Sequence, residues 1–223
     1  MLKIENITKK YDDGKSDILA VNNISLELED GTFVAIVGPR GSGKSTLLTI
    51  MGALQKPSEG KIELDGIELY SVSEKIRSDI RFKKLGFVLQ GSNLIPFLTV
   101  EEQFELKIRK NKSKDKSLYE YLLNNLEISH LRKKYPDEIS GGERQRVAIA
   151  LSLVLQPNII LADEPTASLD TEKSFKVVKM LKKITETMRT TVVMVTHDTR
   201  MLETCDRIFE IVDGNLEEKI LNH

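Results

Sequence analysis

Cysteine, long apolar runs and an excess of charge of either sign are all missing or scarce in this sequence. The one cysteine among 223 residues, Cys205, cannot close a disulfide within the chain. This favours a reducing compartment and excludes a small secreted scaffold held by disulfides. Lys and Arg number 33 against 34 Asp and Glu, so a net charge of -1 provides no global field toward nucleic acid or an anionic membrane. Any such contact has to be local.

Segments that would enter or cross a membrane are missing as well. No apolar run approaches the ~20 residues that a membrane-crossing helix needs. The first residues, Met1-Leu-Lys-Ile-Glu-Asn, lack the basic end and apolar stretch of a signal peptide. We therefore expect a soluble chain with no direct membrane insertion, in which any membrane role depends on a partner. Apolar residues make up 40% of the chain, which suits a globular core and excludes disordered and fibrous classes.

Short apolar runs rich in β-branched residues recur along the chain and predict buried strands at 33–37, 85–89, 159–162 and 192–195. Segments with helical spacing separate them, which predicts an α/β fold with a parallel sheet. Residues 3–8 and 23–29 alternate apolar and polar side chains instead, which is typical of an antiparallel sheet with one solvated face. Residues 99–156 show helical spacing without a strand, which predicts an inserted helical subdomain.

The strongest motif is Gly38-Pro39-Arg40-Gly41-Ser42-Gly43-Lys44-Ser45, which follows the strand predicted at 33–37 and precedes an apolar helical run over 47–54. It matches the phosphate-binding loop pattern in the required context of strand, loop and helix. Glycines let backbone N–H groups converge on a phosphate, Lys44 reaches the β- and γ-phosphates, and Ser45 can ligate magnesium. The alternative is a plain glycine-rich turn. From average residue usage, two glycines at this spacing followed by Lys and then Ser or Thr should arise by chance in roughly one chain of this length in a hundred.

Two further motifs are weaker by themselves. A buried strand ends in the adjacent carboxylates Asp163 and Glu164, which would point to opposite sides of a strand and so serve different roles, one toward hydrated magnesium and one toward an attacking water. Alone, they could be an ordinary acidic strand end. The sequence from Ser140 to Arg146 heads a helix predicted to run to about Leu155, and its Ser-x-x-Glu pattern is an ordinary capping box. Capping does not require the glycine pair at 141–142, which exposes N–H donors to an anion.

Taken together and in this order, the motifs resemble those of a nucleotide-binding subunit of an ATP-binding cassette (ABC) transporter, from about Leu2 to Glu217. Ile139 stands where that family commonly has Leu, Glu143 where it has Gln, and Arg40 where it mostly has a small residue. The resemblance implies a P-loop NTPase with a RecA-like parallel sheet core, an antiparallel β subdomain and an inserted α-helical subdomain. In that scheme residues 1–223 form one ABC ATPase domain, with a core at about 1–94 and 157–223 and the helical subdomain at about 95–156.

The resemblance also implies the site residues and their ligands, ATP and Mg²⁺. Two copies would stack head to tail around two ATP molecules, so that the segment from Ser140 to Arg146 of one chain, which corresponds to the signature loop of the family, faces the ATP on the phosphate loop of the other. The implied catalytic residues are Glu164, which positions or deprotonates water, His197 near the γ-phosphate, and Gln90. Magnesium would be held by Ser45, Gln90 and Asp163. The implied nucleotide contacts are Tyr11 on adenine, Gly38, Pro39, Arg40, Gly41, Ser42, Gly43, Lys44, Ser45, Thr46, Ser140, Gly141, Gly142, Glu143 and Asp170.

Several of these positions also have ordinary interpretations. A lone tyrosine such as Tyr11 is more often packing, a strand-end glutamine such as Gln90 is usually solvated, and a lone His197 is most often structural. Asp170, which follows Ser168 and Leu169 in a segment implied to cross the dimer, is placed to cap the helix predicted to run to Met188.

Residues 90–103 resemble the segment where ATPases of the macrolide-efflux and lipoprotein-release branch meet their permease, and residues 162–170, 177–178 and 196–200 are similar to haem-export and antimicrobial-peptide-resistance ATPases. The implied function is ATP hydrolysis that drives a separate membrane permease, as an exporter, from the cytoplasmic face of the membrane and without nucleic acid. A cell-division ATPase that switches a membrane partner without transport is the alternative. A soluble cassette of DNA repair or translation is disfavoured, because the chain has neither a long coiled coil nor tandem cassettes.

Two segments of the helical insertion bear on the partner. The apolar run at 94–100 is expected to be buried, either within the subdomain or by a permease that docks there. The basic run at 107–116 predicts a solvated helix face and connector, with contact to anionic lipid headgroups as the alternative.

Overall fold

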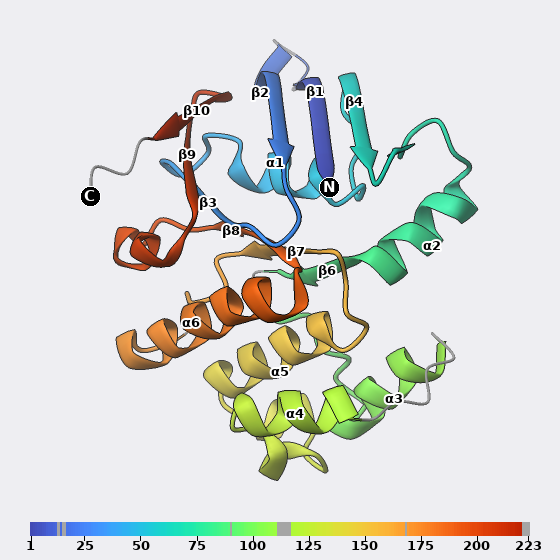
Figure 1. Cartoon of the computed structure of the whole chain (residues 1–223), viewed down its shortest axis with the longest axis vertical. Helices are drawn as coiled ribbons and strands as arrows, with labels where there is room; N and C mark the ends of the chain where they lie inside the picture. Colours follow the sequence, from blue (N-terminus) through green and yellow to red (C-terminus); the bar gives the residue numbers. More distant parts are fainter. Residues whose placement is uncertain (13, 15–16, 90, 111–116, 168, 220–223) are drawn as a thin grey trace.

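The computed structural model describes residues 1–12, 14, 17–89, 91–110, 117–167 and 169–219. Its elements form successive layers: an antiparallel sheet, a helix, a mostly parallel sheet, and then the helices within residues 100–188 (Figure 1). Two apolar cores fill the spaces between these layers, one on each side of the parallel sheet.

The mostly parallel sheet has the strand order β10-β9-β3-β8-β7-β6, and only the β9–β10 pair is antiparallel. Along its central strand, Phe33 and Ala35 face one core while Val34 and Ile36 face the other. This is the continuous apolar pattern of a strand buried on both faces. The strands are β3 (Phe33–Val37), β6 (Leu85–Val88), β7 (Ile159–Asp163), β8 (Thr191–Val195), β9 (Arg207–Val212) and β10 (Asn215–Lys219).

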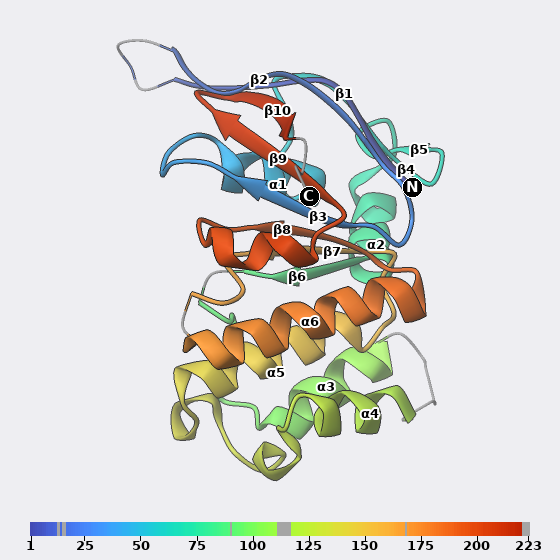
Figure 2. The same ribbon diagram turned by 60° about the vertical axis from the view of Figure 1, so that its left-hand side comes forward.

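The antiparallel sheet has the order β2-β1-β4-β5 and lies on the opposite side of helix α1 from the parallel sheet (Figures 1 and 2). At the start of β1, Leu2 and Ile4 are buried while Lys3 and Glu5 are not, as the alternating pattern predicted. The strands are β1 (Leu2–Asp12), β2 (Asp17–Leu28), β4 (Glu59–Leu64) and β5 (Ile67–Glu68).

Between β6 and β7 the described chain is helical, as the spacing predicted, and α5 and α6 lie along one face of the parallel sheet (Figure 2). The helices are α1 (Lys44–Met51), α2 (Glu74–Lys84), α3 (Val100–Lys110), α4 (Ser117–Asn125), α5 (Gly141–Leu153) and α6 (Thr171–Met188). Short 3-10 helices span Ser129–Leu131, Pro136–Glu138 and Thr199–Thr204.

Some predicted boundaries were too long. Helix α1 ends at Met51 rather than at residue 54, because Gly52 follows and Ala53 adopts a left-handed backbone with φ of +51°. Helix α5 ends at Leu153 rather than at about Leu155, four residues before the helix-breaking Pro157. Strand β6 ends at Val88.

Candidate nucleotide site and its relatives

The phosphate loop is held by close approaches of backbone that only glycine permits. Gly43 has φ of +103°, and a Cβ atom there would lie 2.0 Å from the carbonyl oxygen of Ala20 on β2. A Cβ atom on Gly38 would lie 2.2 Å from the carbonyl oxygen of Ile211 on β9. Gly41 has φ of +79° but no neighbour within 4 Å. Gly38 and Gly43 are therefore needed because a side chain would not fit, and Gly41 because of its left-handed backbone conformation.

Lys44 and Ser42 are the polar side chains buried inside this loop. The ammonium group of Lys44, which is 9% exposed, donates hydrogen bonds to the carbonyl oxygens of Gly38 at 2.8 Å and Pro39 at 2.6 Å. Burial lowers the pKa of Lys44, and the charges of Glu164 and Asp163 partly offset this effect. Ser42 Oγ is buried without a hydrogen-bond partner. An unpaired hydroxyl beside a desolvated cation is the environment that suits a phosphate anion.

The two carboxylates are separated by a turn of the backbone. Asp163 is the last residue of β7, whereas Glu164 lies beyond the strand with φ of +50°, and its N–H donates to the carbonyl oxygen of Val195 at 2.9 Å. Strand alternation, on which the sequence argument relied, therefore does not set their directions. The Glu164 side chain is 15% exposed, and its Oε1 lies 2.7 Å from Nδ1 of His197.

These groups meet because three neighbouring strands end at one edge of the sheet. Strand β8 lies between β3 and β7, and all three are parallel. The phosphate loop follows β3, the two carboxylates end β7, and His197 follows β8. Ligands of open parallel sheets bind at this carboxyl edge. Arg40 and Ser45 are exposed on the loop, and Thr46 is partly buried at the start of α1.

The signature loop lies at the start of α5 and is capped as predicted. Ser140 Oγ accepts from the N–H of Glu143 at 3.3 Å, and the Glu143 carboxylate accepts from the N–H of Ser140 at 2.8 Å. The latter bond is the main cause that lowers the pKa of Glu143. Gly141 and Gly142 form the first turn without contributing to this cap. The capping box is thus present, and it leaves the glycine pair unexplained.

The signature loop faces a cavity of about 450 Å³ that it shares with Asp170 and Lys173, and no residue of its own phosphate loop lines that cavity. Asp170 also caps α6, because its Oδ1 accepts from the N–H of Lys173 at 2.9 Å. Both Asp170 and Ser140 thus have the ordinary capping role that the sequence allowed.

Tyr11 lies apart from the other predicted contacts, on β1 of the antiparallel sheet. Its ring is 37% exposed, and its hydroxyl group bonds Oε1 of Gln55, which follows α1, at 2.9 Å. The Lys9 ammonium group lies 5.2 Å from the ring centroid. The ring is thus anchored at its hydroxyl end and partly exposed to solvent. Two other predicted positions, Gln90 and Ser168, lie outside the described residues.

Two residues near these sites were missed by sequence reasoning. Gln145 is 3% exposed, and it lines a cavity of about 310 Å³ together with Glu164 and Gly141; its Nε2 has no hydrogen-bond partner among the described residues.

Lys107 is partly buried on α3 and donates to the carbonyl oxygen of Leu151 at 2.6 Å, so the prediction of a solvated face was wrong at this residue. The helical spacing could have predicted this burial, because positions 100, 103, 104 and 108 are buried and residue 107 lies on the same helix face.

No group of three or more His, Cys, Asp or Glu side chains within the described ranges could hold a metal ion. This arrangement still fits magnesium bound with a nucleotide, because Mg²⁺ usually takes one or two protein ligands together with phosphate oxygens and water.

The family profile named ABC transporter matches residues 21–167, a range that contains the phosphate loop, the signature loop and both carboxylates. The chain belongs to the ABC transporter family. It is an ABC ATPase subunit that hydrolyses ATP, and it belongs to the same branch as the proteins HrtA, LolD and MJ0796. Within the described residues, no helix combines the length and the apolar character needed to cross a membrane.

Relatives match this ABC ATPase over nearly their whole length. The ATP-binding protein HrtA of Staphylococcus haemolyticus, named for hemin import, is 42% identical over 97% of this chain and 99% of its own. MJ0796 of Methanocaldococcus jannaschii, named as an ABC transporter ATP-binding protein, is 40% identical over 98% and 96%. The lipoprotein-releasing system protein LolD of Francisella tularensis is 40% identical over 97% and 96%.

Solved structures of MJ0796 confirm the predicted fold class. A dimeric structure in a post-hydrolysis state, bound to ADP and phosphate, has a TM-score of 0.92 at 39% identity and covers 100% of both chains. A second dimeric structure has a TM-score of 0.93 at the same identity and coverage.

Proposed function

We propose that this ABC ATPase closes as a head-to-tail homodimer around two ATP molecules and thereby drives a separate membrane permease. The observation that carries the proposal is the separation of two anion-binding elements within one chain. The phosphate loop lies at the carboxyl edge of the parallel sheet, and none of its residues lines the cavity that the signature loop shares with Asp170. A second chain would supply the missing half of each site. That MJ0796 was solved as a dimer supports this arrangement.

In each composite site the residues at the strand ends would take distinct roles. Backbone N–H groups of the phosphate loop, Lys44 and Ser42 would bind the phosphates, and Ser45, Asp163 and Gln90 would hold Mg²⁺. Bound magnesium would supply charge neutralisation on the phosphate oxygens. Glu164, fixed by its left-handed backbone and by His197, positions or deprotonates the attacking water. Tyr11 offers its exposed ring to adenine, and Ser140 to Glu143 with Asp170 grip the nucleotide of the other chain.

The helical region, at about residues 95–156, would dock the permease. Val100 is buried and Leu94 packs against the core, but Phe97 is 77% exposed, so burial within this chain does not account for that ring. Leu94 and Ile95 of the same run line an apolar groove of about 360 Å³, which lies between α2 and β6 on one side and α3 and α5 on the other. An apolar groove and an exposed aromatic ring in one short segment favour a protein partner. The chain would then sit at the cytoplasmic face of the membrane, held there by the permease.

Export is the proposed direction of transport. The resemblance of residues 90–103 to the macrolide-efflux and lipoprotein-release branch supports it, as does the similarity to LolD, a protein of a lipoprotein-releasing system. The name of HrtA refers to import instead. Transport assays with the substrate on either side of reconstituted membranes would decide the direction, once the permease is known.

The experiment that tests the proposal is affinity purification of the full chain, tagged and expressed at its native level, from detergent-solubilised membranes. Mass spectrometry should identify one integral membrane permease that co-purifies in a fixed ratio. Recovery of the chain without any membrane protein would overturn the proposed partner. Stimulation of ATP hydrolysis by the purified permease, and movement of a substrate that depends on ATP, would separate transport from switching of a partner without transport.

A further inference from the structure

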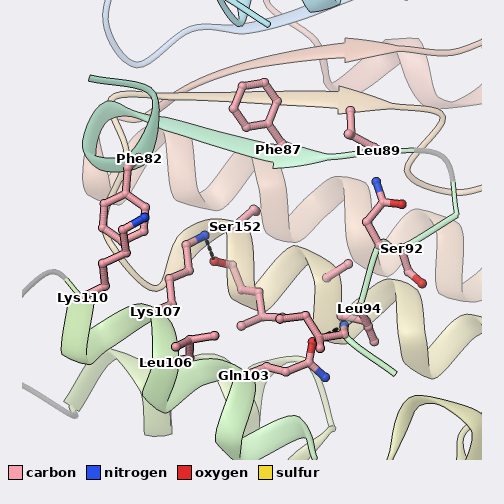
Figure 3. A pocket seen from close by; sticks show the side chains of 14 residues that line it. Phe82, Phe87, Leu89, Ser92, Leu94, Gln103, Leu106, Lys107, Lys110 and Ser152 are labelled. Carbon is pink, nitrogen blue, oxygen red and sulfur yellow. Dashed lines mark hydrogen bonds between the residues drawn. The ribbon is translucent and has the colours of Figure 1, made fainter. Parts of the chain in front are cut away.

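The groove beside α3 combines apolar walls with positive charge (Figure 3). Its walls include Phe82 from α2, Phe87 from β6 and Leu106 from α3. Its volume of about 360 Å³ lies near the lower end of the range for ligand pockets, ~300–1,000 Å³. Such a groove accepts a few side chains rather than a folded element.

Among the residues that the structure describes, the charged side chains that line this groove are lysines. Lys107 and Lys110 of α3 extend into it, and none of the described lining residues is an aspartate or glutamate. The Lys110 ammonium group lies 4.3 Å from the centroid of the Phe82 ring, a cation–π contact that holds it at the rim (Figure 3). The groove therefore presents a net positive charge within apolar walls.

Lys107 is the more deeply placed of the two cations. Within the described part of the chain, its ammonium group has one hydrogen bond, to the carbonyl oxygen of Leu151 at 2.6 Å. An ammonium group has three N–H donors, so this bond leaves two of them for the groove. Burial lowers the pKa of Lys107 to about 8. Among the described residues that line the groove, none is a counter-ion for this desolvated cation.

A purely structural role does not account for this arrangement. Leu151 lies in the last turn of α5, where carbonyl oxygens lack a partner within the helix, and a donor there stabilises the helix end. A neutral hydrogen-bond donor would also stabilise the helix end, without placing a charge among apolar side chains. None of the described residues that line the groove compensates the charge itself, and a carboxylate is the group that would do so.

We propose that the segment of the permease that enters this groove carries an aspartate or glutamate among apolar side chains, and that its carboxylate pairs with Lys107. This inference rests on the proposed function, because it assumes a membrane permease as the partner. The apolar walls bind the apolar side chains, and the ion pair selects the register and the identity of the segment. Charge complementarity in an interface serves selection of the partner in this way.

The first test needs no variant of the chain. Membrane vesicles that contain the native complex are treated with a water-soluble carbodiimide, which activates a carboxylate so that an adjacent amine displaces the activating group as a urea and forms an amide. We expect a covalent adduct of this chain and the permease, with the amide mapped by mass spectrometry to Lys107 and one acidic residue of the permease. An amide between Lys107 and a carboxylate of this same chain, or no amide at Lys107, would overturn the inference.

The second test compares variants in co-purification from detergent-solubilised membranes. Lys107→Met keeps the apolar stem and removes the charge, and we expect it to lower recovery of the permease by about tenfold or more, as for loss of a charged hydrogen bond. Lys107→Arg should retain most of the recovery. Arg109→Met is the matched control, because Arg109 lies on the same helix, is 79% exposed and pairs with Glu105 outside the groove.

The outcomes separate the inference from the function on which it rests. If the wild-type chain recovers no permease, the proposed function fails and the inference with it. If wild-type and Lys107→Met chains recover the permease equally, the inference alone fails. If Lys107→Glu loses the permease and replacing the cross-linked acidic residue of the permease by lysine restores it, the ion pair is established. Unchanged ATP binding by each variant excludes misfolding as the cause.

Discussion

Nδ1 of His197 lies 2.7 Å from Oε1 of Glu164, although the two residues follow different strands, β8 and β7. Glu164 is also held by its backbone, since its N–H donates to the carbonyl oxygen of Val195 and its φ is +50°. A non-glycine residue in this conformation is uncommon, and such strain gathers at functional sites. Two independent constraints thus fix one carboxylate at the edge where the phosphate loop lies.

Glu164→Gln tests the role of this carboxylate. The amide keeps the shape of the side chain but cannot accept a proton from water, so ATP should bind while hydrolysis falls by at least ~100-fold, the lower end for general base catalysis. Two ATP molecules held between two chains should then stabilise the dimer by mass action. Light scattering with saturating ATP and magnesium should show a dimer for this variant and a monomer for the wild type.

Asp163→Asn is the companion variant, because the neighbouring carboxylate is proposed to hold magnesium. It should weaken the ATP complex itself and form no stable dimer. A Glu164→Gln chain that stays monomeric, or that turns over ATP at the wild-type rate, would show that the base or the shared site is wrongly assigned.

Lys44→Ala should weaken ATP binding by ~10-fold or more, because a charge-assisted contact of ~1.5–3 kcal/mol to the phosphates is lost. Among the described residues, the ammonium group bonds the neutral carbonyl oxygens of Gly38 and Pro39, so its loss should weaken phosphate binding more than it disturbs the fold of the loop. Titration calorimetry measures the affinity, and Lys61→Ala on the antiparallel sheet is the control. Equal affinity of the Lys44→Ala and wild-type chains would refute the assignment of this loop.

The glycines of the phosphate loop should differ in their tolerance of alanine. Gly43→Ala places a Cβ atom 2.0 Å from the Ala20 carbonyl oxygen, so β2 and the loop must separate, and both ATP binding and thermal stability should be lost. Gly41→Ala meets no neighbour and should cost only the ~1–2 kcal/mol of a left-handed backbone. Thermal unfolding of both variants measures their stability. A Gly41→Ala chain that is less stable than the Gly43→Ala chain would contradict the prediction.

Phe97→Asp should abolish recovery of the permease while leaving the ATPase of the isolated chain intact, because the ring is 77% exposed and has little packing to lose. Tyr121→Asp, on α4 of the same helical region, replaces another exposed aromatic ring and should have no effect on recovery. Co-purification from membranes and phosphate release by the isolated chain are the two measurements. Unfolding of the Phe97→Asp chain would indicate instead that the ring is needed inside the subdomain.

Lys107 should give the free chain a pH dependence of stability that Lys107→Met lacks. Its pKa is lowered to about 8 from 10.5, so the folded state carries the full penalty of a buried charge below pH 8. That penalty is relieved as the pH rises from 8 toward 10.5, because the folded chain then releases the proton before the unfolded chain does. Urea unfolding at pH 7 and pH 9.5 should show the wild type gaining stability relative to Lys107→Met. Parallel changes in the two chains would contradict the lowered pKa.

The sequence by itself determined the parts whose requirements are local. A phosphate loop needs glycines, lysine and serine within a few residues, between a strand and a helix, so the segment from Gly38 to Ser45 could be identified without a structure. The capping box at Ser140, the helix cap at Asp170 and the alternation of β1 are local as well, and they appear where predicted. The roles of Tyr11, Gln90, Asp170 and His197 came from resemblance, because a single residue carries no pattern of its own.

Only the tertiary structure decided which distant residues meet and which face is buried. Strand order in the sheet places β8 between β3 and β7, and this order brings His197 to Glu164 across 33 positions of sequence. The close approach of Gly43 to Ala20 depends on packing of one sheet against another. The burial of Lys107 depends on the end of α5, which lies 44 positions further along the chain. Hydrophobic burial and strand pairing act between segments far apart in sequence, so a local pattern does not contain their outcome.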